Sequence, residues 1–549
     1  MFVIGVDFGT LSARALLVDT FSGKSAASAV FEYPHGVMDR CLPDGTPLPG
    51  DWALQHPQDY LDALGNVIPA VLEKSGIDPA DVVGVGVDVT ACTLLPVRAD
   101  GTPLCFDPAF AGDRHAYVKL WKHHAASDEA ARVTALAKAR GEAFLPYYGG
   151  RVSPEWALPK IMETLSGSPE VYAAADRFIE AADWIVWMLT GRETRSVCCQ
   201  GYKFLYAPES GYPDDGFFTA LDARLADVKS KFGPEPLPVG ARAGGLSAAA
   251  AELTGLSVGT SVAAGMIDAH VFVPAAGIAS SGELLGIMGT SACYMLLSEK
   301  KAAVPGICGV VKDGILPGFY GYEAGQSSVG DCFQWMIDNA LPQSYIKEAA
   351  EKGVGIHRLL GEKAAALAPG ESGLLALDWF NGCRTPYVDG MLSGGIVGLT
   401  LQTRPGEIYR ALLEATAFGA RAIVENYLSA GLAVDSLLAS GGIAQKDPFL
   451  LQLYADVLGL PVRVAGGAEG GALGAAFYAF LAACPGEDLS AAVPKFGERS
   501  GSVYVPDSAH KAIYDLLYEE YRRLTSYFAC GNDVMKRLKR ISQERNSHV

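Results

Sequence analysis

Two short apolar segments joined by a glycine turn begin the chain. Residues 2–8 are apolar except for Asp7, and residues 15–18 are apolar again. Runs of this length on either side of a tight turn are typical of adjacent strands. The turn offers backbone N–H groups, two hydroxyls and a guanidinium, a combination that binds phosphate oxygens, and Asp7 can hold a metal ion through water. The candidate phosphate contacts are Gly9, Thr10, Ser12 and Arg14.

The same pattern returns in the middle of the chain. Residues 283–297 again run from apolar to turn to apolar, although Met288 stands where the first copy has its aspartate. The candidate contacts of this second turn are Gly289, Thr290 and Ser291. One such turn fits an ordinary hairpin as well as a phosphate site. Two related turns predict a nucleotide polyphosphate held between two related domains.

Other apolar runs predict buried strands that end in carboxylates. Residues 82–89 form one such run with Asp88 near its end, and residues 262–270 form another that delivers Asp268 to a turn. Ligands of open α/β sheets lie outside the carboxyl ends of the strands. Asp88 is therefore a candidate ligand group, with a structural capping carboxylate as the alternative. Helical periodicity predicts helices at 57–75, 181–191, 331–339, 408–428, 447–458, from Gly470 onward, and from Pro506 to the tail.

Four further segments carry polar groups or paired glycines. Residues 436–442 end a strand at Gly441 and Gly442, where the absence of a Cβ lets a flat ligand lie against the backbone. Residues 115–126 have a helical pattern, but His123 and His124 are adjacent and point apart, which disfavours a metal site. Lys203 lies in a loop-like stretch and Glu323 in a glycine-rich loop over residues 321–330.

Composition limits the class of protein. A chain of 549 residues exceeds one core, and 50% apolar with 19% charged residues fits a globular enzyme. The net charge of −17 disfavours nucleic acid and anionic membranes as partners. Eleven cysteines without a paired spacing indicate reduced thiols, and neither a signal peptide nor a membrane span is visible. These observations predict a cytoplasmic protein.

Together these motifs resemble the FGGY carbohydrate kinases, which belong to the actin- and hexokinase-like ATPases. The two phosphate turns and the segment 440–446 match that family in order and spacing from residue 2 to about 485. The resemblance implies an α/β fold with two RNase H-like domains and an ATP and sugar cleft between them. It divides the chain into an N-terminal domain at 1–278, a C-terminal domain at 279–490 and a helical extension at 491–549.

Within the family, the longest matches are to the kinases of ribulose, over residues 84–96, 115–126, 201–203, 266–270 and 321–326. The resemblance makes Asp268 the general base, gives Lys203 and Glu323 the sugar hydroxyls, and places Ala91 where the sugar contacts backbone. It assigns ATP with Mg²⁺ as cofactors and a possible homodimer. The implied adenine contacts are Gly441, Gly442 and Lys446, although many members have asparagine where Lys446 stands.

The implied reaction is ATP-dependent phosphorylation of the terminal hydroxyl of ribulose, with L-ribulose expected, in pentose (arabinose) catabolism. A kinase for another ketose or polyol, such as xylulose, ribitol or glycerol, is the alternative in the same class. A chaperone or filament ATPase of the actin-like group is an alternative from another class. That last alternative predicts ATP turnover without sugar dependence, and it does not explain the carboxylates and lysine in the sugar positions.

Overall fold

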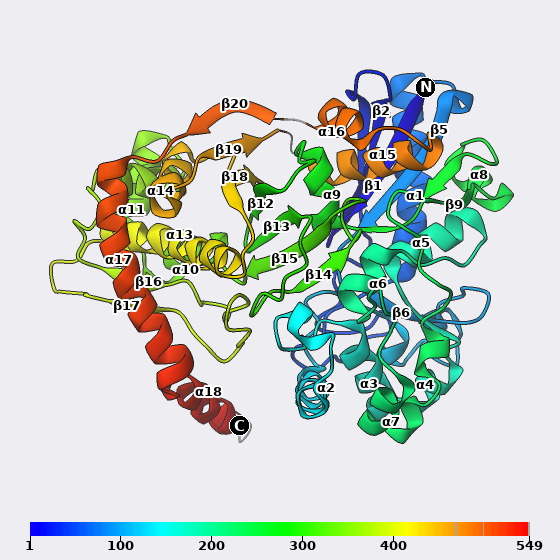
Figure 1. Cartoon of the computed structure of the whole chain (residues 1–549), viewed down its shortest axis with the longest axis horizontal. Helices are drawn as coiled ribbons and strands as arrows, with labels where there is room; N and C mark the ends of the chain where they lie inside the picture. Colours follow the sequence, from blue (N-terminus) through cyan, green and yellow to red (C-terminus); the bar gives the residue numbers. More distant parts are fainter. Residues whose placement is uncertain (467–468, 498, 547–549) are drawn as a thin grey trace.

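The computed structural model describes residues 1–466, 469–497 and 499–546, in which two sheet-centred domains lie side by side (Figure 1). The first sheet has the order β3-β2-β1-β5-β10-β9, with β11 beside β5. In it, β1 is antiparallel to β2 and parallel to β5. Its strands are β1 (Phe2–Phe8), β2 (Ser12–Asp19), β3 (Ser25–Glu32), β5 (Val82–Val89), β9 (Arg242–Gly245), β10 (Ser261–Ala263) and β11 (Met266–Ile267).

The second sheet repeats the centre of the first. Its order is β14-β15-β13-β12-β18-β19-β20, and β12 is antiparallel to β13 and parallel to β18. The repeat predicted from the two phosphate turns is thus a repeat of whole sheets. The strands are β12 (Gly282–Met288), β13 (Ala292–Ser298), β14 (Gly309–Lys312), β15 (Tyr320–Gln326), β18 (Val434–Ser440), β19 (Val462–Ala465) and β20 (Arg499–Tyr504).

A lobe with its own hydrophobic core is inserted in the first domain, at the lower right of Figure 1. Its small sheet has the order β4-β7-β6-β8, from β4 (Leu54–Gln55), β6 (Leu94–Val97), β7 (Val118–Lys119) and β8 (Arg177–Glu180). Its helices are α2 (Ser127–Arg140), α3 (Ala157–Gly167), α4 (Pro169–Ala174) and α7 (Asp215–Leu221). The other helices of this half are α1 (Pro57–Ser75), α5 (Ala181–Thr190), α6 (Val197–Lys203), α8 (Ala248–Thr254) and α9 (Asp268–Ala275).

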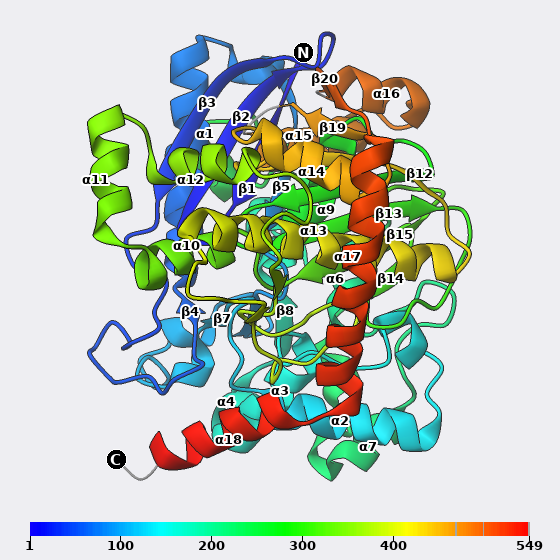
Figure 2. The same ribbon diagram turned by 90° about the vertical axis from the view of Figure 1, so that its left-hand side faces the viewer.

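Helices also surround the second sheet. Figure 2 shows α17 running along the outside of this domain and α18 turning away at its end. The helices are α10 (Gly330–Ala340), α11 (Gln343–Lys352), α12 (Ile356–Ala365), α13 (Pro405–Ser429), α14 (Pro448–Leu458), α17 (Ser508–Ser526) and α18 (Val534–Asn546), with a hairpin of β16 (Leu375–Leu377) and β17 (Gly395–Val397). No helix among the described residues has both the length and the apolarity that a bilayer span requires.

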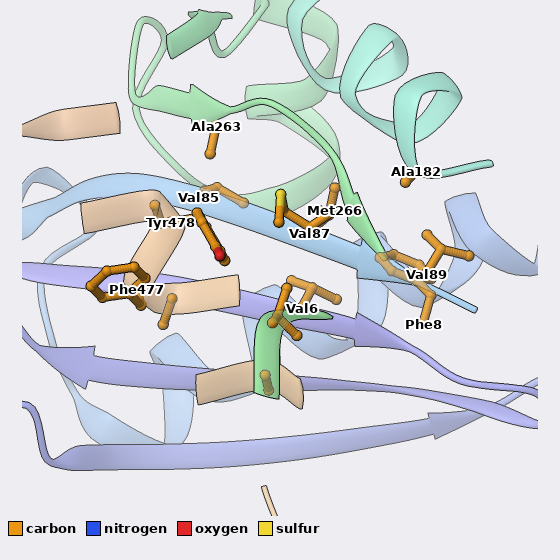
Figure 3. Close-up of a cluster of buried hydrophobic side chains, with 14 of the residues drawn as sticks. Val6, Phe8, Val85, Val87, Val89, Ala182, Ala263, Met266, Phe477 and Tyr478 are labelled. Carbon is orange, nitrogen blue, oxygen red and sulfur yellow. The ribbon is translucent and has the colours of Figure 1, made fainter. Parts of the chain in front are cut away.

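Helix α15 (Gly470–Ala483) returns to the first domain and packs across β1 and β5. Glycines permit this contact, because a Cβ at Gly5 would lie 1.8 Å from the carbonyl oxygen of Ala472, and a Cβ at Gly86 2.1 Å from that of Ala475. Figure 3 shows Phe477 and Tyr478 of α15 among the valines of the first sheet. The next helix, α16 (Leu489–Phe496), joins the same core.

The packing therefore does not follow the order of the chain. The range predicted as the C-terminal domain, 279–490, contains α15, which belongs to the core of the first sheet. The predicted helical extension at 491–549 contributes β20 to the edge of the second sheet before its helices begin. The residues of α15 are themselves apolar on every face of the helix. The sequence of α15 therefore does not specify which sheet it covers.

Four local predictions were wrong. The run at 262–270 is not one strand that ends in a turn, since β10 ends at Ala263, β11 covers Met266–Ile267 and Asp268 begins α9. Residues 115–126 are not a helix, since they contain β7 and turns and bury polar side chains in the inserted lobe. Lys203 is not in a loop but is the last residue of α6. Glu323 lies in the strand β15, whose glycines make room for neighbours: a Cβ at Gly321 would lie 2.5 Å from the hydroxyl of Tyr202.

Candidate active site between the two domains

The two predicted phosphate turns are each closed by a glycine N–H, although the hydrogen-bonded loop of the second is one residue shorter. The N–H of Gly9 donates to the carbonyl oxygen of Ser12 at 2.9 Å, and the N–H of Gly289 donates to that of Ser291 at 2.9 Å. Each turn follows the central strand of its sheet, β1 or β12. Because the sheets are related by the repeat, the turns occupy equivalent places in the two domains.

Neighbouring elements hold the carbonyl oxygens of both turns. In the first turn, Thr10 accepts a hydrogen bond at its carbonyl from Gln55 Nε2 (2.8 Å) and at its hydroxyl from Trp121 Nε1 (3.2 Å). In the second, the N–H of Gly330 at the start of α10 donates to the carbonyl of Gly289 at 3.0 Å. Neighbouring elements thus fix the turns through their acceptors, while the N–H groups of Gly9 and Gly289 are used within the turns. Arg14 lies 3.5 Å from Glu469 Oε1, so its guanidinium is already paired at the edge of the first turn.

The predicted adenosine segment adjoins the second turn. Strand β18 runs parallel to β12, with Ser440 opposite Ile287. Gly441 follows with a φ of 93°, and a Cβ there would lie 2.4 Å from the carbonyl oxygen of Met288. Gly442 faces open space and Lys446 is exposed. The glycine pair therefore joins an open surface to the phosphate turn, as a nucleotide site requires.

Three aspartates meet at the carboxyl ends of β1, β5 and β11. Asp7 lies opposite Asp88 in the register of β1 and β5, and Met266 of β11 lies opposite Asp88 on its other side. Asp268 follows two residues later as the first residue of α9, where its Oδ1 accepts the N–H of Ala269 at 2.7 Å. Burial, followed by the charge of Asp7, raises the pKa of Asp268 to about 7.

These carboxylates fit a hydrated divalent cation. Burial and the charges of Asp7 and Asp268 raise the pKa of Asp88 well above its ordinary value. Arg14, opposite Asp7 on β2, is a cation beside the row. Within the described residues, no three His, Cys, Asp or Glu side chains converge to hold a metal ion directly. Mg²⁺ keeps several of its waters and needs few protein ligands, so Asp7 is suited to hold it through water.

The two predicted sugar contacts bind each other across the domain boundary. Lys203 Nζ of α6 lies 3.0 Å from Glu323 Oε2 and 3.3 Å from its Oε1 on β15. His270 Nε2 lies 3.1 Å from the same Oε2. Lys203 is only 2% exposed, and the adjacent Glu323 raises its pKa despite burial. The ion pair therefore ties α6 of one domain to the central sheet of the other.

Ala91 lies in a turn that a buried lysine holds. The next residue, Cys92, has a φ of 57°, and its carbonyl oxygen accepts a hydrogen bond from Lys160 Nζ at 2.6 Å. The same ammonium donates to the carbonyl oxygen of Leu120 at 2.8 Å. Lys160 is fully buried, and burial lowers its pKa to about 8. The conformation of the backbone at Ala91 therefore depends on a residue that sequence reasoning did not select.

The stretch 115–126 supports this turn and the first phosphate turn. Lys119 Nζ donates to Glu163 Oε2 at 2.7 Å, and His123 Nε2 lies 2.9 Å from the same oxygen, all within the inserted lobe. Trp121, from the same stretch, reaches the hydroxyl of Thr10. These contacts give the stretch a structural role beside the site, and its histidines bind carboxylates of the protein.

A second pair of charges crosses the domain boundary. Arg384 of the second domain donates to Glu155 Oε1 at 3.2 Å, and His124 Nε2 lies 3.2 Å from the same oxygen. Arg384 also lies beside the strand of Glu323, since a Cβ at Gly325 would be 2.9 Å from its Cδ. Neither Arg384 nor Glu155 was predicted, because no local motif marks two residues that are 229 positions apart.

Comparison with known proteins identifies the family. The N-terminal domain profile of the FGGY family of carbohydrate kinases matches residues 2–273, and its C-terminal domain profile matches residues 284–483. The chain belongs to the FGGY family of carbohydrate kinases. The predicted family and its two-domain α/β kinase fold are thereby confirmed, and the assigned site residues stay predictions.

Several relatives resemble this FGGY kinase over almost their whole length. It is 49% identical to a ribulokinase of Bacillus licheniformis, with 97% of each chain covered. It is 50% identical to a ribulokinase of Geobacillus thermodenitrificans, with 98% of this chain and 96% of the relative covered. The structure of xylulose kinase from Rhodospirillum rubrum matches with a TM-score of 0.80 at 25% identity, over 96% of this chain and 98% of that one. Glycerol kinase from Plasmodium falciparum matches in fold, with a TM-score of 0.76 at 17% identity, over 95% and 98%.

Proposed function

We propose that this FGGY kinase transfers the γ-phosphoryl group of ATP to the terminal hydroxyl of ribulose, with L-ribulose as the expected isomer. The products are ribulose 5-phosphate and ADP, and the expected setting is pentose (arabinose) catabolism. The observation that carries the proposal is the position of Asp268 beside Asp7 and the first phosphate turn, with a pKa of about 7. The ribulokinase names of the relatives support ribulose as the sugar.

Asp268 is the proposed general base. A primary alcohol attacks phosphorus well only if its proton leaves as the P–O bond forms. The alcohol proton moves to the carboxylate of Asp268, the new bond joins the sugar oxygen to the γ-phosphorus, and the bond to the leaving ADP breaks. A base whose pKa is near 7 is ionised in much of the protein at neutral pH and is still basic enough to accept the proton.

The nucleotide would bind between the two phosphate turns, with its adenosine at Gly441 and Gly442. The proposed phosphate contacts are the residues of the two turns, Gly9, Thr10, Ser12, Arg14, Gly289, Thr290 and Ser291. Mg²⁺, when held through water by Asp7, would neutralise negative charge on the phosphates. Lys446 is exposed in the turn before α14 and is the proposed base contact in place of the asparagine of other members.

Sugar recognition is assigned to Lys203, Glu323 and the backbone of Ala91. The ammonium and carboxylate are buried and bonded to each other, so a sugar hydroxyl must fit an existing network. A wrong sugar that leaves one of these groups unpaired loses about 1–3 kcal/mol per group. The proposed partner is thus a small sugar rather than nucleic acid or a membrane, and a homodimer stays a prediction.

Phosphorylation of xylulose is the second candidate. It is favoured by the 25% identity and common fold with the xylulose kinase from Rhodospirillum rubrum. A coupled assay of ADP release across L-ribulose, D-ribulose, xylulose, ribitol and glycerol separates the candidates. We expect the highest kcat/KM with L-ribulose. A higher value with xylulose or a polyol would refute ribulose as the substrate, and sugar-independent turnover would refute the kinase assignment.

A further inference from the structure

Asp88 has a buried carboxylate that the proposed reaction does not use. The residue is 0% exposed, and neither Oδ1 nor Oδ2 has a hydrogen-bond partner among the described residues. Buried carboxylates ordinarily accept hydrogen bonds from amides, hydroxyls or cationic side chains, because an unsatisfied charge in the interior is costly. The side chain directly beside Asp88 is another carboxyl, that of Asp7. The oxygens of Asp88 can therefore be satisfied by a proton shared with Asp7 or by a cation.

The neighbours of Asp88 indicate that this partner is positive. Asp7 is directly opposite on β1, and Asp268 follows the neighbouring strand β11. Three carboxylates on adjacent strands repel one another unless a cation or a shared proton lies among them.

The row of carboxylates leads from the interior to the cleft. In-register residues of adjacent strands are about 4.8 Å apart. Asp88 is fully buried whereas Asp7 is partly exposed, so the row ends at the first phosphate turn. Gly471 of α15 closes one side, since a Cβ there would lie 2.5 Å from Asp7 Oδ2. Asp7 and Asp88 lie on the face of the sheet that α15 covers, because Gly5 and Gly86, two residues earlier on the same strands, both pack against α15. A hydrated cation beside Asp7, at the N-terminal end of α15, is therefore also next to Asp88.

We propose that Asp88 is a second carboxylate of the divalent-cation site, which holds waters of the Mg²⁺ of ATP together with Asp7. An Mg–water distance of about 2.1 Å and a hydrogen bond of about 2.7 Å place the cation about 4–5 Å from the carboxylate oxygens. The proposal rests on the ATP site of the proposed function, but not on the identity of the sugar.

Asp88→Asn tests the proposal through Mn²⁺ binding without sugar. Free Mn²⁺ is measured by electron paramagnetic resonance with wild-type protein, with and without a non-hydrolysable ATP analogue. The matched control is Asp183→Asn on α5, a carboxylate that is also buried at 1% exposure but accepts a hydrogen bond from Gln200 Nε2 at 3.3 Å. We expect at least a tenfold weaker Mn²⁺ affinity for Asp88→Asn and a change below twofold for the control.

The opposite result would assign a different role. If Asp88 is instead a neutral acid that donates a hydrogen bond to Asp7, the amide of Asn can replace it and Mn²⁺ affinity stays at the wild-type value, which overturns the proposal. A crystal of the wild-type protein with Mn²⁺ and the analogue keeps the test valid if the variant does not fold. An anomalous peak within about 5 Å of the Asp88 carboxylate supports the proposal, and a more distant peak overturns it. Both measurements are made without sugar, so they would be unchanged if the protein proved not to phosphorylate ribulose.

Discussion

Replacing Lys203 by Met tests the ion pair that joins the two domains. The change keeps the length of the side chain but removes the ammonium that lies 3.0 Å from Glu323 Oε2. Glu323 is then left buried with His270 as its remaining partner. Removing one member of a buried ion pair typically costs about 3–5 kcal/mol, because the other charge stays desolvated. We therefore expect α6 and β15 to open more easily by that amount.

The size of the effect depends on pH. Lys203 and His270 lower the pKa of Glu323 below its ordinary value. The pair therefore contributes stability that is fully present above the ordinary glutamate pKa of about 4.3 and is lost as pH falls through the lower folded value. A measurement at pH 7 sees the whole contribution. Lys203 supports the same conclusion, because its raised pKa keeps it charged at that pH.

Hydrogen–deuterium exchange with mass spectrometry is the assay, because it reports local opening of peptides over α6 and β15 in a protein of two domains. The double variant Lys203→Met/Glu323→Gln completes a thermodynamic cycle. We expect it to cost less than the sum of the single variants, with an interaction energy of at least about 1 kcal/mol. Single effects that add to within about 0.5 kcal/mol would refute a direct interaction across the boundary.

Three further predictions concern catalysis and binding. Asp268→Asn should lower kcat by about 10²–10⁴. In the wild type, the rate should rise as pH increases through about 7, because the base must lose its proton. Stopped assays across pH should show that this rise is absent in the variant. Lys160→Met should raise the KM for ribulose about tenfold, since about 1.4 kcal/mol is lost at the Ala91 turn, with the KM for ATP unchanged in steady-state kinetics. Ribulose and an ATP analogue should tighten each other's binding about 5–150-fold by calorimetry, because the site spans both domains.

Each of these has a clear contrary result. Near-normal turnover by folded Asp268→Asn would remove Asp268 as the base. Lys231→Met is the control for Lys160, since Lys231 also donates to a buried backbone carbonyl, that of Ala175 at 2.7 Å, but lies away from the Ala91 turn. Equal effects of the two lysine variants on the KM for ribulose would contradict a specific role for Lys160. Independent affinities of sugar and nucleotide would contradict closure of the domains around both ligands.

Local patterns predicted the regular parts of the fold well. The helix predicted at 57–75 and the strand predicted at 82–89 have those bounds in the structure. The helix is a continuous segment with one buried face, and the strand is a continuous segment that is buried on both faces. The two glycine turns also identified the repeated sheets. Patterns of this kind express the local geometry of one element, and local geometry is what short-range sequence determines.

Contacts between distant segments were beyond the sequence. Glu323 was predicted in a loop because glycines at 321 and 325 interrupt the apolar pattern, but these glycines make room for Tyr202 and Arg384 within a strand. Lys203 looked like an exposed loop lysine, because its partner Glu323 is 120 residues away. The residue roles themselves came from resemblance to a family, and they stay predictions until the variants are measured.

The return of α15 to the first sheet has a consequence for synthesis of the chain. The ribosome releases β1 and β5 more than 380 residues before Gly470. Until then, the glycine-lined face of the first sheet lacks its covering helix. The first domain therefore completes its folding after most of the second has been made, which is slow and leaves an intermediate open to aggregation. A fragment that ends before residue 470 should need a chaperone to remain dispersed.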